Sequence, residues 1–139
     1  MKVKCFVIML FLLLACSVSY AVEIALITDK NNPVDSISAK DAKNIFLGKK
    51  KSWDGGGSVT PVIQKNASVT EAFTRSIVKK SSAQYTLFWR KAIFTGTGTP
   101  PVEVEDDAAM KKMVAAKSGA VGYISADALD GSVKKLNIN

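Results

Sequence analysis

The sequence predicts an α/β domain built on a mainly mixed β-sheet, and two observations support this. Short apolar runs rich in β-branched residues alternate with segments whose apolar residues recur at helical spacing. Turn-forming Gly, Pro, Asn and Asp residues separate the two kinds of segment. Alternating strands and helices are typical of a sheet covered by helices in two or three layers. We therefore expect a mixed sheet flanked by about four helices.

The amino-terminal segment has the features of an export leader, which we place at residues 1–21. A basic start precedes an unbroken apolar run at 5–16, and small residues follow up to position 21. The run is shorter than the roughly 20 residues that span a bilayer. Cleavage of this signal peptide would leave 22–139 as one domain in the periplasm. In the alternative, Cys16 carries a lipid and anchors the protein to a membrane.

The composition excludes much catalytic and metal chemistry. The chain has no His, and both of its Cys residues lie in the expected leader. The mature domain therefore lacks Ser-His and Cys-His nucleophiles and zinc sites of the ordinary type. Two of the 19 basic residues lie in the leader, so 17 basic and 12 acidic residues give the mature domain a net charge of +5. We expect no enzymatic activity, no cofactor and no metal. Because the basic pairs are scattered and the chain is exported, we also expect no nucleic-acid partner.

The mature chain is expected to open with a strand and a helix. Residues 22–28 form a mostly apolar, β-rich run, which predicts a buried strand, and the turn formers at 29–33 end it. Ser38 is placed to cap a helix over 39–47, for which Gly48 is the natural end.

A glycine-rich loop and a second strand come next. Trp53 precedes Gly55–Gly57, and it is either a contact residue for a ligand or a loop aromatic that folds back on the domain. The strand is expected at 58–64. Because proline has no N–H to donate, Pro61 predicts an edge or irregular strand.

Capping boxes predict two helices in the middle of the chain. Residues 68–71 fit the S-x-x-E pattern, which predicts a helix that begins at Ser68. Residues 81–84 repeat the pattern with Gln in place of Glu. The inner face of this third helix is expected to be aromatic and apolar: Tyr85, Phe88, Trp89, Ala92 and Ile93.

The last third of the chain contains a helix and two strands. The helix is expected over 106–117, and the strands over 120–125 and 133–138. The threonine-glycine loop at 95–99 lacks the Lys-Ser/Thr of a P-loop, so we interpret it as a surface connection or a lid.

An ordered set of short motifs resembles one known family. The motifs are Ile45–Lys49 (IFLGK), Trp53–Gly55 (WDG), Phe88-Trp89, Ile93–Gly96 (IFTG), Pro100-Pro101 and Gly119–Ile124 (GAVGYI). In this order they resemble the small phosphate ABC transporter substrate-binding protein-like family of the type 2 periplasmic binding protein superfamily. The resemblance covers about residues 37–136. It implies a single periplasmic-binding-protein-like lobe. It also implies an exported, non-enzymatic protein that binds phosphate or a related small oxyanion, with an ABC transporter permease as its partner.

The resemblance also points to a ligand site at the start of the second helix. In larger phosphate binders of this superfamily, an Arg precedes a Ser-Gly-Thr turn at a helix start. Ser68 and Thr70 match the Ser and Thr of that turn, whereas Val69 stands in place of the Gly and Gln64 in place of the Arg.

Elementary physics favours the same place, because the first N–H groups of a helix are unpaired and attract an oxyanion. Lys65 or Arg75 could supply the missing positive charge. The predicted ligand-binding residues are Gln64, Lys65, Asn66, Ser68, Thr70 and Arg75. A single lobe would bind weakly unless another subunit or a partner completes the pocket. Alternatively, Ser68 only caps its helix, and the protein is an envelope interaction protein that keeps the fold without the ligand.

Overall fold

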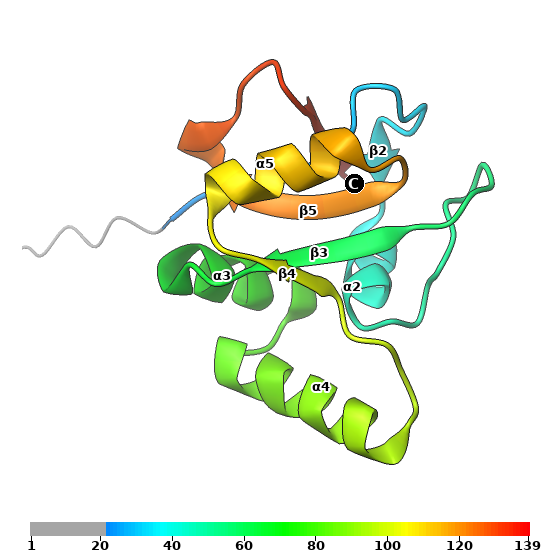
Figure 1. Cartoon of the computed structure of the whole chain (residues 1–139), viewed down its shortest axis with the longest axis vertical. Coiled ribbons are helices and arrows are strands. Elements are labelled where there is room, and N and C mark those ends of the chain that lie inside the picture. Colours follow the sequence, from blue (N-terminus) through cyan, green and yellow to red (C-terminus); the bar gives the residue numbers. More distant parts are fainter. Residues whose placement is uncertain (1–21) are drawn as a thin grey trace, which may run out of the picture.

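The computed structural model describes residues 22–139; the predicted leader and Cys16 lie outside the described residues. The helices and strands alternate as expected (Figure 1). In chain order they are β1 (Ile24–Thr28), β2 (Ser36–Ile37), α2 (Ala39–Phe46), β3 (Thr60–Gln64), α3 (Ala67–Phe73), the π-helical η1 (Thr74–Val78), α4 (Ser82–Thr95), β4 (Val102–Val104), α5 (Asp107–Ala116), β5 (Ala120–Ser125), the 3₁₀-helical η2 (Ala126–Ala128), β6 (Lys134–Lys135) and β7 (Asn137–Ile138). No helix within this part of the chain has the length and apolarity to cross a bilayer.

The main sheet has five strands in the order β4-β3-β5-β1-β6. β3 runs parallel to β4 and β5, whereas β1 runs antiparallel to β5 and β6. The sheet is therefore mixed, as the sequence predicted. The short strands β2 and β7 form a separate parallel pair.

Helices cover both faces of this sheet. Successive residues of a strand point to opposite faces, so Gly122 and Tyr123 of β5 mark the two sides. A side chain at Gly122 would collide with Met110 of α5, because its Cβ would lie 2.3 Å from the Met110 Sδ. On the other face, the Tyr123 ring stacks on Phe73 at a centroid distance of 3.8 Å and meets Phe46 edge-on at 6.3 Å. α5 therefore forms one outer layer, and α2 and α3 form the other.

The helix starts depend on polar caps, and two of the predicted caps are confirmed. The Ser38 hydroxyl accepts a hydrogen bond from the Asp41 N–H, and Ser81 and Gln84 form a complete capping box. The predicted cap at Ser68 is wrong, because the capping residue is Asn66, two positions earlier. The chain leaves β3 in extended conformation at Asn66, whose side chain accepts the hydrogen bond from the Val69 N–H, so α3 begins at Ala67.

Pro61 was predicted to mark an edge or an irregular strand, and the edge strand is wrong, because β3 lies between β4 and β5. The Thr60 N–H points toward β5, where it donates to the Gly119 carbonyl over 3.0 Å. Alternation along the strand turns the Pro61 nitrogen toward β4, and pairing with β4 begins only at Val62. Proline fits here because no strand faces its nitrogen.

The carboxyl-terminal stretch 133–138 was predicted as one strand and is two. β6 pairs with β1 in the main sheet, and β7 pairs with β2 in the small one. The change of partner occurs at the buried Leu136, whose N–H still donates to the Leu26 carbonyl. The short strands β2 and β4 were not predicted, because two or three residues carry no readable alternation.

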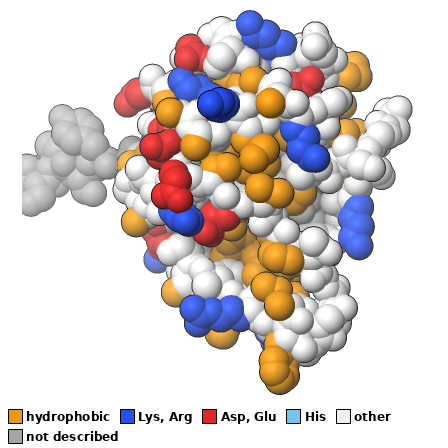
Figure 2. All heavy atoms as spheres, in the orientation of Figure 1, with side chains coloured by type: hydrophobic (Ala, Val, Ile, Leu, Met, Phe, Trp, Pro, Cys, Tyr) orange, Lys and Arg blue, Asp and Glu red, His pale blue; other side chains and the backbone are white. Residues whose placement is uncertain are grey.

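Helix α4 lies apart from the sheet and packs on η1 (Figure 1), and its Tyr85 hydroxyl donates a hydrogen bond to the Phe46 carbonyl of α2. Its inner face contains the predicted Tyr85, Trp89 and Ala92, but Ile93 was wrongly placed there and is 56% exposed. Leu87 and Phe94 are also exposed. Figure 2 shows hydrophobic side chains at the lower end of the molecule, where α4 lies. The helix thus leaves an apolar outer side uncovered.

Candidate functional site

The predicted ligand residues gather at the junction between β3 and α3. Residues 65–68 are all exposed at the carboxyl end of β3. Asn66 Oδ1 accepts the Val69 N–H over 3.2 Å and the Ser68 hydroxyl over 3.0 Å. The N–H groups of Ala67 and Ser68 donate no hydrogen bond within the described residues. Two backbone donors at a helix start therefore face solvent, which is the condition for attracting an anion.

Thr70 points inward instead of toward solvent. Its hydroxyl donates to the Gln64 carbonyl over 2.7 Å and lies 3.0 Å from the Tyr123 hydroxyl, which in turn accepts the Gln64 N–H over 3.1 Å. Because the only Thr70 hydroxyl hydrogen is used on the carbonyl, Tyr123 must donate to Thr70. The three residues thus close a ring of hydrogen bonds. Burial raises the pKa of Tyr123, so its hydroxyl stays protonated and keeps this donor.

The Gln64 side chain is almost completely buried, at 2% exposure. Its amide nitrogen donates to Asp107 Oδ1 over 2.9 Å and to the Tyr123 carbonyl over 2.8 Å. Both amide hydrogens are therefore occupied. Gln64 Oε1 is buried and has no partner in the described part of the chain.

The two basic candidates are both in ion pairs. Lys65 Nζ lies 2.8 Å from Glu105 Oε1, and this hydrogen bond raises the pKa of Lys65. Arg75 Nε lies 2.5 Å from Glu71 Oε1. Hydrogen bonding from Ser82, with a smaller contribution from Arg75, lowers the pKa of Glu71. Figure 2 shows acidic and basic side chains intermixed on the edge of the molecule where α3 and the start of α5 lie.

The junction brings five of the six predicted residues together but not Arg75. Arg75 lies eight residues beyond Ala67, which is about 12 Å along a helix. It borders, with Ser68, a broad open groove of about 890 Å³ between α3–η1 and the start of β1. That groove is mostly apolar, with Val22, Ile24 and Ile77 in its walls. Arg75 is thus poorly placed to share a small ligand with the free N–H groups.

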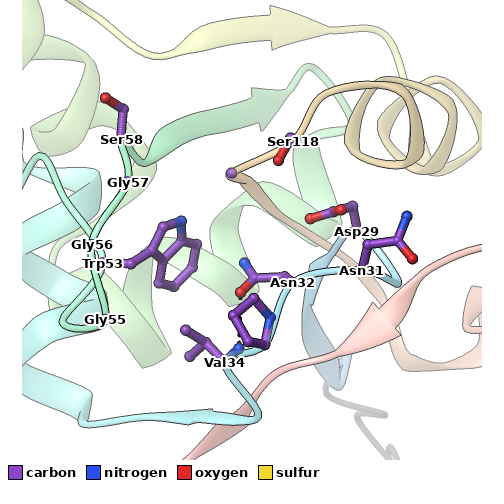
Figure 3. A pocket seen from close by; sticks show the side chains of 12 residues that line it. Asp29, Asn31, Asn32, Val34, Trp53, Gly55, Gly56, Gly57, Ser58 and Ser118 are labelled. Carbon is purple, nitrogen blue, oxygen red and sulfur yellow. Dashed lines mark hydrogen bonds between the residues drawn. The ribbon is translucent and has the colours of Figure 1, made fainter.

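A smaller pocket, of about 280 Å³, lies at the opposite end of the sheet. It is lined by the turn after β1, by the glycine-rich loop and by Gly119, and sequence reasoning did not assign it to a ligand. The one residue that drew attention to this region in the sequence was Trp53. It was interpreted either as a contact residue for a ligand or as a loop aromatic that folds back on the domain. Trp53 does fold back, at 7% exposure, and in doing so it becomes a wall of this pocket (Figure 3). No cluster of metal-ligating side chains occurs in residues 22–139.

Comparisons with known proteins agree with this fold. A sequence model described as the PBP superfamily domain matches residues 19–137, and the chain belongs to this family. An ABC-type phosphate transport receptor from Vibrio cholerae is similar in structure, with a TM-score of 0.65 and 20% identity over 84% of this chain and 46% of that one.

Two further solved structures extend the likeness. A putative phosphate ABC transporter substrate-binding protein from Clostridium perfringens, with bound phosphate, has a TM-score of 0.64 and 27% identity over 84% of this chain and 45% of its own. A high-affinity periplasmic phosphate-binding protein, PfluDING, bound with phosphate, has a TM-score of 0.58 and 20% identity over 85% and 38%. This chain therefore spans less than half the length of each of these proteins.

Proposed function

We propose that the chain is an exported, non-enzymatic solute-binding module for phosphate or a related small oxyanion, with the site at the β3–α3 junction. The observation that carries the proposal is the pair of unpaired N–H groups at Ala67 and Ser68, on a fold shared with phosphate-binding proteins. We further propose cleavage of residues 1–21 and a periplasmic location, with lipidation at Cys16 as the alternative. A membrane permease or a second copy of the chain is the proposed partner.

An oxyanion at the junction would use groups that can turn outward at low cost. The Ser68 hydroxyl is bonded only to Asn66 and is exposed. Lys65 is paired with Glu105 across an exposed salt bridge, and such pairs contribute roughly 0 to 1 kcal/mol. The Lys65 ammonium can therefore leave Glu105 for a bound anion. Asn66 Oδ1 is occupied, but its amide nitrogen is available as a further donor.

The expected affinity is low. Three charge-assisted hydrogen bonds contribute about 5 to 9 kcal/mol gross, of which at least about 4 kcal/mol is lost on immobilising the ligand. The remainder falls short of the roughly 8 kcal/mol that a micromolar site requires. The ring of hydrogen bonds around Thr70 and the buried Gln64 amide cannot add donors without rearrangement. A second lobe or subunit would have to close over the ligand to tighten binding.

A second candidate function follows from the same contacts. The charged residues at the junction are paired, and α4 exposes Leu87, Ile93 and Phe94. An exposed apolar helix face favours protein contact. In this reading the protein keeps the PBP-like fold, has lost ligand binding, and acts in the cell envelope through its surface.

A calorimetric titration with phosphate, with sulfate for comparison, distinguishes between the two proposed functions. Gln64→Arg restores the positive charge next to Asp107, so we expect it to tighten phosphate binding about tenfold or more, since a hydrogen bond to a charged group is worth about 1.5 to 3 kcal/mol. Thr86→Arg adds the same charge on the exposed side of α4 and should leave binding unchanged. Ser68→Ala should weaken it. No heat from the wild type or from folded Gln64→Arg at phosphate concentrations up to about 100 mM would exclude anion binding and favour the interaction protein.

A further inference from the structure

The outer side of α4 exposes apolar side chains that the fold itself does not use. The inner side of the helix is already packed. Tyr85 and Trp89 are buried there, and a Cβ added at Gly48 would lie 2.9 Å from the Trp89 ring. On the outer side, Phe94 is 93% exposed and Leu87 is 65% exposed. Large apolar side chains gathered in one exposed place are typical of an interaction surface.

Two basic residues lie between these two apolar side chains. Leu87 and Phe94 are two helical turns apart, or about 10 Å along the axis of α4. Arg90 and Lys91 each lie three or four residues from both of them, and residues at that spacing are neighbours on a helix surface. All four side chains are exposed, and we call them the α4 ridge. The ridge thus combines apolar side chains with positive charge.

The charge around the α4 ridge has one sign. The sequence contains no Asp or Glu at positions 72–102, whereas the same stretch contains five basic residues. Four of these five are in no ion pair within residues 22–139: Lys79, Lys80, Arg90 and Lys91. On the face seen in Figure 2, acidic side chains lie in the upper and middle parts of the molecule, while hydrophobic and basic ones occupy the lower end. The ridge therefore lies in a positive field.

Two hollows border α4, and basic residues line both. The larger, of about 580 Å³, lies along the second half of the helix and contains Lys49 and Lys91. The smaller, of about 280 Å³, lies at the start of the helix and contains Lys79 and Lys80. Among the described residues, no Asp or Glu lines either hollow. Anionic groups that approach α4 therefore meet ammonium groups near both of its ends without a competing carboxylate.

This chemistry distinguishes among the possible occupants of the ridge. Two copies of the chain packed through it would bring their basic residues together, and like charges across an interface are unfavourable. Another protein would need an apolar cleft with carboxylates spaced to match Arg90 and Lys91. A bilayer of anionic lipid needs no such match, because it offers acyl chains to the apolar side chains and phosphate groups to the basic ones. Lys and Arg keep their charge at the lipid–water boundary while their stems lie on apolar surface.

We propose that α4 docks on the surface of an anionic lipid bilayer, with Leu87 and Phe94 inserted among the acyl chains and Arg90 and Lys91 at the level of the phosphate groups. The helix lies in the plane of the interface and does not cross the bilayer. Because few side chains insert, the attachment is reversible and weakens as salt screens the charges. It does not depend on anion binding at the β3–α3 junction, since no predicted ligand residue of the junction belongs to the ridge.

A fluorescent reporter on the ridge of the full-length chain tests the proposal. Phe94→Trp places an indole there, and vesicles that contain brominated lipid quench an indole that enters the bilayer. We expect quenching by vesicles of phosphatidylglycerol and phosphatidylcholine, and about tenfold more lipid to be needed with phosphatidylcholine alone. Lys112→Trp, on the exposed side of α5, is the control and should not be quenched. Because the signal comes from α4, it is separate from any lipid contact of residues 1–21.

Matched charge variants in the Phe94→Trp background examine the basic residues. Arg90→Gln combined with Lys91→Gln should raise the lipid needed for quenching about tenfold. Lys112→Gln combined with Lys117→Gln removes the same charge from exposed positions on and just after α5, and should change it less than about twofold. Equal effects of the two pairs would contradict docking through α4.

Other results would assign the ridge to a different occupant and overturn the proposal. Absence of quenching in Phe94→Trp, or equal quenching by neutral and anionic vesicles, would exclude an anionic bilayer. A dimer in sedimentation velocity that Leu87→Ser combined with Phe94→Ser abolishes, without quenching, would assign the ridge to a second copy. Co-sedimentation with native envelope membranes that the same double variant abolishes, again without quenching by protein-free vesicles, would assign it to a membrane protein.

Discussion

The two ends of the sheet differ in how their polar groups are satisfied. At the β3–α3 junction, the predicted side chains are exposed or hydrogen-bonded, and the basic ones sit in ion pairs. At the other end, Asp29 and Trp53 are buried, and one Asp29 oxygen and the Trp53 indole N–H have no partner among residues 22–139. The free donors of the junction, the N–H groups of Ala67 and Ser68, are open to solvent, whereas the two unpaired atoms at the other end are enclosed by the protein. Polar residue types in a suggestive order do not show whether their donors are free.

The largest expected effect is on the free energy of unfolding. It is seen by comparing alanine substitutions at Gly57 and Gly119, two glycines that line the small pocket. Gly119 has φ +81° and no room for a Cβ, whereas Gly57 has φ +91° and open space around it. Gly57→Ala should cost about 1 to 2 kcal/mol of unfolding free energy, from backbone strain alone. Gly119→Ala should cost about 3 kcal/mol or more, because the collision with Ser58 adds to the strain. Urea unfolding measures both losses of stability. Equal losses would show that the backbone around Ser58 moves to make room for the added methyl group.

A double-mutant cycle measures whether the ring of hydrogen bonds at the junction acts as one unit. Tyr123→Phe leaves the buried Gln64 N–H without its acceptor, so we expect a loss of about 1 to 3 kcal/mol. Thr70→Val breaks the same ring of hydrogen bonds, and the two changes should couple by about 0.5 to 3 kcal/mol. Tyr123→Phe combined with Thr95→Val, on the exposed end of α4, is the additive control. Additivity in the first pair would mean that the ring does not act as a unit.

The smallest expected effect concerns the acid sensitivity of the junction helix. Glu71 accepts the Ser82 N–H over 2.9 Å and pairs with Arg75, and its pKa is lowered in the folded protein. A lowered pKa means that its stabilisation is present at neutral pH and is lost as the pH falls through the folded-state pKa. Glu71→Gln should therefore flatten the dependence of the urea midpoint on pH below about pH 5. Glu103→Gln is the control, and identical slopes in both variants would contradict the assignment.

Much of the fold could be predicted because its signals are local. The caps at Ser38 and Ser81 and the strand at 120–125 depend on neighbouring residues and were confirmed. The start of α3 could not be decided in this way, since Asn66 and Ser68 are both good capping residues. Asn66 is the cap because the strand ends there.

The candidate sites depend on contacts between distant parts of the chain, and this limited their prediction. Gln64 is paired with Asp107, and Lys65 with Glu105, each across about forty residues. The turn at 29–33 was predicted, but the burial of Asp29 beside Trp53 arises only from the tertiary fold. No local pattern in either segment indicates that a carboxyl oxygen and an indole N–H become enclosed without a partner among the described residues.

The position of β1 in the sheet has a consequence for when the protein can fold. The first strand of the domain has as its neighbours β5 and β6, both of which follow it by about ninety residues or more in the sequence. During synthesis, β1 has no strand partner until the chain has been made at least as far as β5, about ninety residues later. Contacts of such long sequence separation slow folding. A chain built in this order leaves its first strand unpaired for longer than one that closes its sheet from the amino terminus onward.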